Sequence, residues 1–323
     1  MKTRSEYFDN AKGILIFLVV FGHLIDLVCH SDSSGWIRYA FIVIWAFHMP
    51  AFIFIAGLFD HRRDKFPLRR VLGFLALGFA LKIANIIVLK IYPGAAADPS
   101  LWSDKNFPWF MFALAAFITI AYITQKIHPA IVMITAIVLS FVAGYFSWIG
   151  DFLYLSRILV FFPIYFYGYL VKPKDVEFIY TRPRVRGVCF VGFVACVLYC
   201  GVNLDVIYKF RPLFTGRNPY SGWVLENHGA LMRFDAYLIG MTIAFFFFGV
   251  VPVKKLPLLT RIGEFTLSIY ALHYYPIFLL DGIGVIAALN AGLHPLVLLC
   301  VFAVIAAVEC VVIAYATPKR KFV

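Results

Sequence analysis

The sequence predicts an all-α integral membrane protein: one transmembrane domain over residues 1–323, built as a bundle of about ten helices with both termini cytoplasmic. Of its 323 residues, 63% are hydrophobic and only 14% are charged. Soluble domains carry roughly 45–50% apolar and about 25% charged residues. The apolar residues form runs long enough to cross about 30 Å of hydrocarbon, and most basic residues fall in short segments between the runs. Together these observations exclude an ordinary soluble fold.

Ten apolar runs follow one another along the chain, and each predicts one membrane crossing. They cover residues 13–29, 39–59, 71–92, 107–125, 129–148, 152–171, 187–202, 230–251, 265–289 and 295–316. Turn-forming residues punctuate the segments between them, as at Pro93-Gly94, Pro183, Pro252, Pro257 and Pro318. The first run is too long for a removable signal peptide and lacks a small-residue cleavage site on its outer flank, so we expect it to remain as a helix.

The basic residues give the orientation of this bundle. Of 29 lysines and arginines, 20 fall on one side of the predicted topology, and that side is cytoplasmic by the positive-inside rule. The net charge of +12 therefore indicates topology rather than a nucleic-acid partner. The six cysteines form no CxxC pair, which argues against a disulfide framework or a cysteine-based metal site.

The first helix carries a cation and an imidazole in helical register. Lys12 and His23 are eleven positions apart, close to three turns and about 16 Å along one helix face. Lys12 is thus expected at the cytoplasmic end and His23 near the bilayer centre, where a polar group indicates function. Asp26, one turn on, is placed to accept the second ring proton of His23. An acyl-coenzyme A, with phosphates at one end and a reactive carbonyl on a long arm, suits this spacing.

Other polar side chains lie within the apolar runs. His48 and His273 are expected to face the bundle interior, either as interhelical hydrogen-bonding groups or in catalysis. Lys82 lies in the third run, and Asp281 and Glu309 are its candidate partners. No HxxxH or HExxH pattern is present, so we expect no metal. Arg69 and Arg70 belong to a dense basic segment that by itself indicates topology and anionic lipid.

At this point the sequence resembles the acyltransferase-3 family of bacterial membrane O-acyltransferases, especially its fucose 4-O-acetylase-like branch. The first helix is similar to the family signature of a basic residue, ten residues and a histidine, with Lys12 where most members have arginine. Further blocks match in order from about residue 4 to residue 280: Phe47-His48-Met49-Pro50 to Ala56-Gly57, Arg69-Arg70, Pro108-Trp109-Phe110, Ser156-Arg157 through Phe161-Phe162-Pro163 to Gly168-Tyr169, and Gly263 with Thr266 to Tyr270 and His273.

The resemblance implies a multi-pass protein of the bacterial inner membrane that moves an acyl group, usually acetyl, from acyl-coenzyme A to a hydroxyl of a glycan or lipid-linked sugar. It implies His23 as the catalytic base. It further implies donor or acceptor binding by Lys12, Arg69, Arg70, His48, His273 and Arg157. Acetyl-coenzyme A would be the co-substrate, with no metal and no nucleic acid, and membrane lipid would surround the chain.

Two other functions stay open from the sequence alone. Buried histidine, lysine and glutamate also build proton relays, so a proton-coupled transporter or flippase is the main alternative, although no repeated half is evident. A structural membrane scaffold is the third. The outer segment 203–229 contains aromatic and polar residues that suit either carbohydrate binding or interface anchoring. It does not reveal the acceptor.

Overall fold

The computed structural model describes residues 5–32, 34–91, 100–103, 108–217, 219–220 and 225–318, without the side chains of 89–91, 225 and 226. Within these ranges the regular secondary structure is helical, apart from an isolated bridge between Ser103 and Phe152. The all-α prediction is therefore confirmed. The expected turn at Pro93-Gly94 lies outside the described residues.

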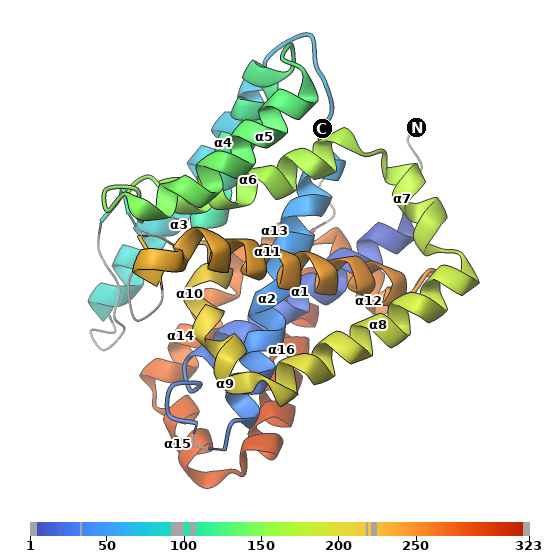
Figure 1. Ribbon diagram of the computed structural model, residues 1–323. Helices are drawn as coiled ribbons and strands as arrows, with labels where there is room; N and C mark the ends of the chain where they lie inside the picture. The colour runs from blue at the N-terminus through green and yellow to red at the C-terminus, as the bar shows by residue number, and fades with distance from the viewer. Residues whose placement is uncertain are drawn as a thin grey trace. The chain divides into compact units, whose positions relative to one another are not determined.

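Most of the long helices in Figure 1 overlap the apolar runs of the sequence, whereas several short helices lie between the runs. In chain order they are α1 (Glu6–Asp26), α2 (Trp36–Leu58), α3 (Leu68–Ile91), α4 (Trp109–Thr124), α5 (Pro129–Val142), η1 (Ala143–Tyr145), α6 (Leu155–Leu170), α7 (Pro173–Tyr180), α8 (Pro183–Val202), α9 (Leu204–Ile207), η2 (Tyr208–Phe210), α10 (Arg211–Phe214), α11 (Leu225–Val250), α12 (Pro257–Glu264), α13 (Thr266–Leu272), α14 (Tyr274–Gly282), α15 (Val285–Gly292) and α16 (Pro295–Ala316).

Six helices in the described ranges are long and apolar enough to cross a membrane, namely α1, α2, α3, α8, α11 and α16. Two bent pairs raise this number to eight if each is one span: α6 with α7, bent by 86°, and Thr266–Gly282 with α15, bent by 67°. The bend before α15 falls at Gly284, whose φ of +79° favours glycine. At 16 residues, α4 is about 24 Å long, short of about 30 Å of hydrocarbon. A multi-pass helical protein is confirmed, whereas ten crossings stay a prediction.

The described contacts divide the chain into two compact units, which leaves the predicted single domain untested. One consists of Met1–His48, Glu177–Tyr208 and Thr242–Val323, and the other of Met49–Val176 and Lys209–Met241. We call them the histidine unit and the arginine unit after the side chains described below.

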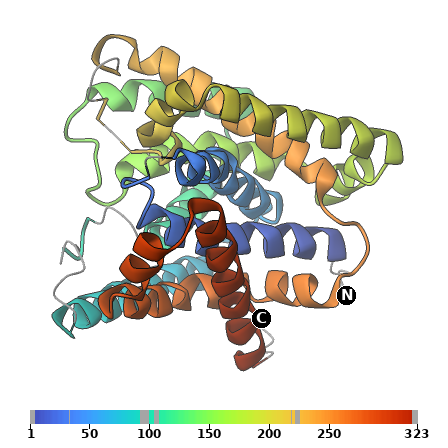
Figure 2. The ribbon, with the colours of Figure 1, turned by 90° about the horizontal axis from the view of Figure 1, so that it is seen from below.

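In the histidine unit, α1 packs against α12, α13 and α16, and Figure 2 shows the short orange and red helices that precede α16. Two glycines make the α1–α12 contact close. A Cβ atom on Gly263 would lie 1.7 Å from the carbonyl oxygen of Asp9, and one on Gly13 would lie 2.4 Å from that of Leu259. Small residues of this kind let membrane helices approach backbone to backbone. They fix α1 against the C-terminal part of its unit.

In the arginine unit, α3 packs on α4, and α6 packs on both α4 and α5. The end of α2 approaches α6 through a second glycine pair. A Cβ on Gly57 would lie 2.0 Å from the Tyr165 carbonyl oxygen, and one on Gly168 would lie 2.3 Å from that of Phe54. This close packing brings the loop after α2 next to Tyr165.

Candidate active site

Three histidines predicted separately come together in the histidine unit. The rings of His23 on α1 and His273, between α13 and α14, have centroids 5.3 Å apart. Trp45 on α2 lies near both His23 and the third histidine, His48. Its ring centroid is 5.9 Å from that of His23 and 5.2 Å from that of His48. Tyr274 also contacts His23, at a centroid distance of 4.9 Å. The sequence placed each histidine inside a helix, but only the fold shows that they share a site.

Hydrogen bonds distinguish His23 from the other two. Nδ1 of His48 donates to the Ile44 carbonyl oxygen at 2.7 Å, and Nδ1 of His273 donates to that of Tyr270 at 2.8 Å. A backbone carbonyl only accepts, so Nδ1 carries a proton in both rings, and Nε2 keeps the lone pair in the neutral form. His48 and His273 are 5% and 0% exposed. Their rings are therefore held in one tautomer and orientation.

His23 differs from both, because it lacks such a hydrogen bond within the described ranges and is less deeply buried. Its side chain is only half-buried, and no residue within the described ranges hydrogen-bonds to its ring nitrogens. The expected bond to Asp26 does not form, because α1 ends at Asp26 and this carboxylate accepts instead from the Cys29 thiol at 3.8 Å. His23 thus has both ring nitrogens available to a substrate, as a general base requires.

The other end of α1 is fixed by polar contacts. Lys12 Nζ lies 2.7 Å from Asp9 Oδ1, and that carboxylate is 3% exposed. Asn10 accepts from the Thr260 hydroxyl at 2.7 Å and donates to the carbonyl oxygens of Pro252 and Lys254. The helix is unbroken between Lys12 and His23, so the three-turn spacing holds. Asn10 was not singled out from the sequence, since an asparagine near a helix start gives no sign of a distant partner.

In the arginine unit, a buried aspartate organises the basic segment. Asp60, 2% exposed, accepts from Arg63 at 3.0 Å, from Arg70 at 2.8 Å and from the Tyr165 hydroxyl at 2.6 Å. Arg69 is exposed at the start of α3. We call Asp60, Arg63, Arg70 and Tyr165 together the Asp60 cluster. Sequence reasoning missed Asp60, because an acidic residue beside several basic ones resembles an ordinary solvated loop.

Arg157 and Lys82 both donate to backbone carbonyl groups and lie near aromatic rings. The Arg157 guanidinium, 4% exposed, lies 5.1 Å from the Trp109 ring centroid and donates to the Thr215 carbonyl oxygen at 3.4 Å. Lys82 Nζ donates to the carbonyl oxygens of Ser100 and Ser103 at 2.6 and 2.8 Å. Arg157 therefore helps to position the segment around residue 215. The substrate-binding role that the resemblance implies for Arg157 stays a prediction.

The predicted acidic partners of Lys82 have other surroundings. Glu309 is 7% exposed, and neither of its carboxylate oxygens has a hydrogen-bond partner within the described ranges. Asp281 is exposed. The predicted pairing of Lys82 with Asp281 or Glu309 stays a prediction.

One group of possible metal ligands lies at the end of α1. The ligand atoms of Asp26, Cys29 and His30 are within 4.8 Å of one another. The Cys29 sulfur also accepts from the Tyr208 hydroxyl at 3.8 Å. This arrangement does not test the expectation that the reaction needs no metal, which stays a prediction.

The helices and side chains define a multi-pass membrane protein with an accessible histidine on its first helix. A family model described as an acyltransferase domain matches residues 5–315. The chain therefore belongs to the acyltransferase-3 family, which confirms the resemblance seen in the sequence, while the fucose 4-O-acetylase-like branch is not tested.

Two curated relatives, both called nodulation protein NolL, are similar over part of the chain. The one from Sinorhizobium fredii is 49% identical over 55 residues, 17% of this chain and 15% of the relative. The one from Mesorhizobium japonicum is 32% identical over 148 residues, 41% of this chain and 39% of the relative. The matched stretches thus span well under half of either relative. No solved structure matches the chain.

Proposed function

We propose that this protein is a membrane O-acetyltransferase that moves an acetyl group from acetyl-coenzyme A, on the cytoplasmic side, to a hydroxyl of a cell-surface glycan or glycolipid. The observation that carries the proposal is the state of His23: half-buried, without a hydrogen-bond partner in the described ranges, and surrounded by Trp45, His273 and Tyr274. Membership of the acyltransferase-3 family supports the reaction class.

In the proposed step, His23 takes the proton of the acceptor hydroxyl as its oxygen attacks the thioester carbonyl. The C–O bond forms, the C–S bond breaks, and the proton on His23 passes to the departing coenzyme A thiolate. A neutral imidazole shielded from bulk water suits this role. His48 and His273, with fixed tautomers, are proposed to orient the substrates.

Donor binding is assigned to cytoplasmic cations. Lys12, Arg69 and Arg70 are proposed to contact the phosphates of coenzyme A, with Arg157 as a further substrate-binding group. Asp9 and Asp60 would hold Lys12 and Arg70 in place, since each forms an ion pair with its cation. Such pre-positioned cations bind phosphate with less loss of side-chain entropy.

The proposed topology has ten crossings of the bacterial inner membrane, with both termini cytoplasmic. Single cysteines at Asp205 and Arg184, in a background without native cysteines, test it. A membrane-impermeant thiol reagent should label position 205 in intact cells and position 184 only after permeabilisation. The reverse pattern would invert the topology.

Radiolabelled acetyl-coenzyme A tests the activity. Membranes that contain the protein should transfer label into an extracted glycan or glycolipid fraction, whereas membranes from a strain without it should not. A proton-coupled transporter or flippase is the second candidate, and the buried Glu309 favours it because such carboxyls serve proton relays. Substrate movement across sealed vesicles without acetyl transfer would establish that alternative and overturn the proposal.

A further inference from the structure

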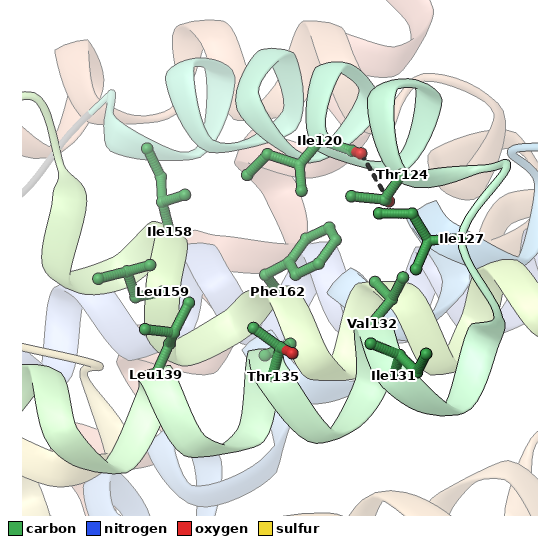
Figure 3. Close-up of a pocket in the computed structure, with 11 residues that line it drawn as sticks. Ile120, Thr124, Ile127, Ile131, Val132, Thr135, Leu139, Ile158, Leu159 and Phe162 are labelled. Atoms are coloured by element: carbon green, nitrogen blue, oxygen red, sulfur yellow. Dashed lines mark hydrogen bonds between the residues drawn. The ribbon is translucent and has the colours of Figure 1, made fainter.

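The arginine unit also contains a cavity, which is lined by residues outside the Asp60 cluster. Helices α4, α5 and α6 enclose about 230 Å³, with Phe162 projecting between Ile120 and Thr135 (Figure 3). The Thr124 hydroxyl beside it donates to the Ile120 carbonyl oxygen at 2.7 Å, so this polar group is already bonded. Most of the lining is aliphatic or aromatic. A cavity of this kind excludes water and accepts apolar groups.

The cavity opens onto a surface suited to lipid. Its lining residues Ile127, Ile131 and Leu139 are 45%, 58% and 46% exposed. Ile123 on α4 and Ile134 on α5 are more than 60% exposed. Exposed apolar side chains gathered on one surface mark a site for an apolar partner, which in a membrane protein includes lipid. An acyl chain would therefore enter the cavity from the side that these residues face.

Positive charge adjoins one end of the cavity. Gln125 follows the lining residue Thr124, and its carbonyl oxygen accepts from Arg62 at 2.6 Å. The Gln125 side chain also bonds the backbone of Arg63, accepting from its N–H at 3.3 Å and donating to its carbonyl oxygen at 3.1 Å. Lys126 comes next and is exposed. In the part of the chain that the structure describes, neither Arg62 nor Lys126 forms an ion pair.

We propose that this cavity binds one acyl chain of an anionic membrane phospholipid, whose phosphate lies against Arg62 and Lys126. The apolar lining matches the chain, and the two cations match the headgroup charge. Basic residues at the ends of membrane helices attract anionic lipids in this way. The bound molecule would be a fixed structural lipid rather than the acyl donor.

Native mass spectrometry of the purified full chain tests the proposal with two probes, dioleoyl-phosphatidylglycerol and dioleoyl-phosphatidylcholine. The wild type should bind one phosphatidylglycerol at least tenfold more tightly than phosphatidylcholine. Replacing both cations, Arg62→Gln with Lys126→Gln, should remove most of this preference. Equal binding of the two lipids by the wild type would overturn the proposal.

Two pocket variants locate the chain. Ala136→Phe fills the cavity, and Ile131→Asn makes its half-exposed mouth polar without adding bulk to the packed interior. Each should weaken phosphatidylglycerol binding at least tenfold. Val138→Phe is the matched control, because this exposed residue lies on α5 outside the cavity. Ile131→Asn remains decisive if Ala136→Phe fails to fold. Unchanged phosphatidylglycerol binding by folded Ile131→Asn, or an equal loss of binding in Val138→Phe, would refute the site. Displacement of phosphatidylglycerol from the wild type by palmitoyl-coenzyme A would also refute it.

Discussion

Removing the Asp60 carboxylate should destabilise the protein more than any change at an exposed acid of the same loop. Asp60 is 2% exposed and accepts three hydrogen bonds. The hydrogen bond that Asp60 accepts from the Tyr165 hydroxyl is buried. A hydrogen bond to a charged group contributes about 1.5–3 kcal/mol to stability. The Arg63 and Arg70 side chains are 38% and 35% exposed, so water screens these two pairs to about 0.2–1 kcal/mol each. Asp60→Ala should therefore cost about 3 kcal/mol.

Thermal unfolding of the purified protein in detergent measures this cost. For proteins of 150–250 residues, 1 kcal/mol corresponds to about 2–4 °C in melting temperature, and a longer chain lies at the lower end. We expect Asp60→Ala to melt about 6 °C below the wild type. Asp64→Ala is the matched control, because Asp64 is an exposed acid of the same loop.

Tyr165→Phe separates the buried bond from the exposed pairs. It should account for most of the loss, and in the double variant the two losses should not add, since both remove the same hydrogen bond. If Asp60→Ala melted within about 1 °C of Asp64→Ala, the Asp60 cluster would have no energetic importance and the reasoning would be wrong.

Four further predictions follow from the site and the packing. His23→Ala should lower acetyl transfer about 10²–10⁴-fold, the usual contribution of a general base, without changing the melting temperature; near-normal turnover with an inactive His273→Ala would move the role to His273. Lys12→Ala should weaken coenzyme A binding and reduce its salt dependence, whereas Lys12→Arg keeps the charge and should retain binding; isothermal titration decides between them. Gly263→Ala should cost about 1–3 kcal/mol, because its Cβ meets the Asp9 carbonyl oxygen, while Gly187→Ala, with open space around it, should not; thermal unfolding compares the two. Asp32 accepts from the Ser34 hydroxyl and from backbone N–H groups of Ser34, Ile37 and Arg38. Burial tends to raise the pKa of Asp32, but these bonds together lower it. The ionised Asp32 carboxylate therefore stabilises the fold above its unfolded-state pKa, and this stabilisation is lost as the pH falls through its folded-state pKa. An Asp32→Asn variant should melt below the wild type at pH 7 and at the same temperature as the wild type in strong acid.

Helix positions were predictable because hydrophobic runs determine them directly. The helix α1 and the Lys12–His23 spacing follow from local periodicity, which needs no knowledge of the neighbours. The break at Gly284 was not predicted, since a glycine in an apolar run gives little sign of its φ angle. The predicted run 107–125 exceeds α4 by only three residues, because Pro108 and Gln125 are the caps of this helix.

Contacts between helices were beyond the reach of the sequence. Each histidine was recognisable as a buried polar residue, yet nothing local places His273 beside His23. The same holds for Asp60, whose partner Tyr165 is 105 positions away. Such pairs depend on which helices pack together, and glycines such as Gly57 and Gly263 determine this through close approach.

The bonds of Asn10 constrain how this chain can vary between species. One side chain near the N-terminus accepts from Thr260 and donates to the carbonyl oxygens of Pro252 and Lys254, about 240–250 positions away. Serine at position 260 keeps the donor, whereas valine leaves the buried amide oxygen of Asn10 unbonded and favours a compensating change at position 10. Positions 10 and 260 should therefore change together in an alignment of relatives, so that the two ends of the chain evolve as one unit.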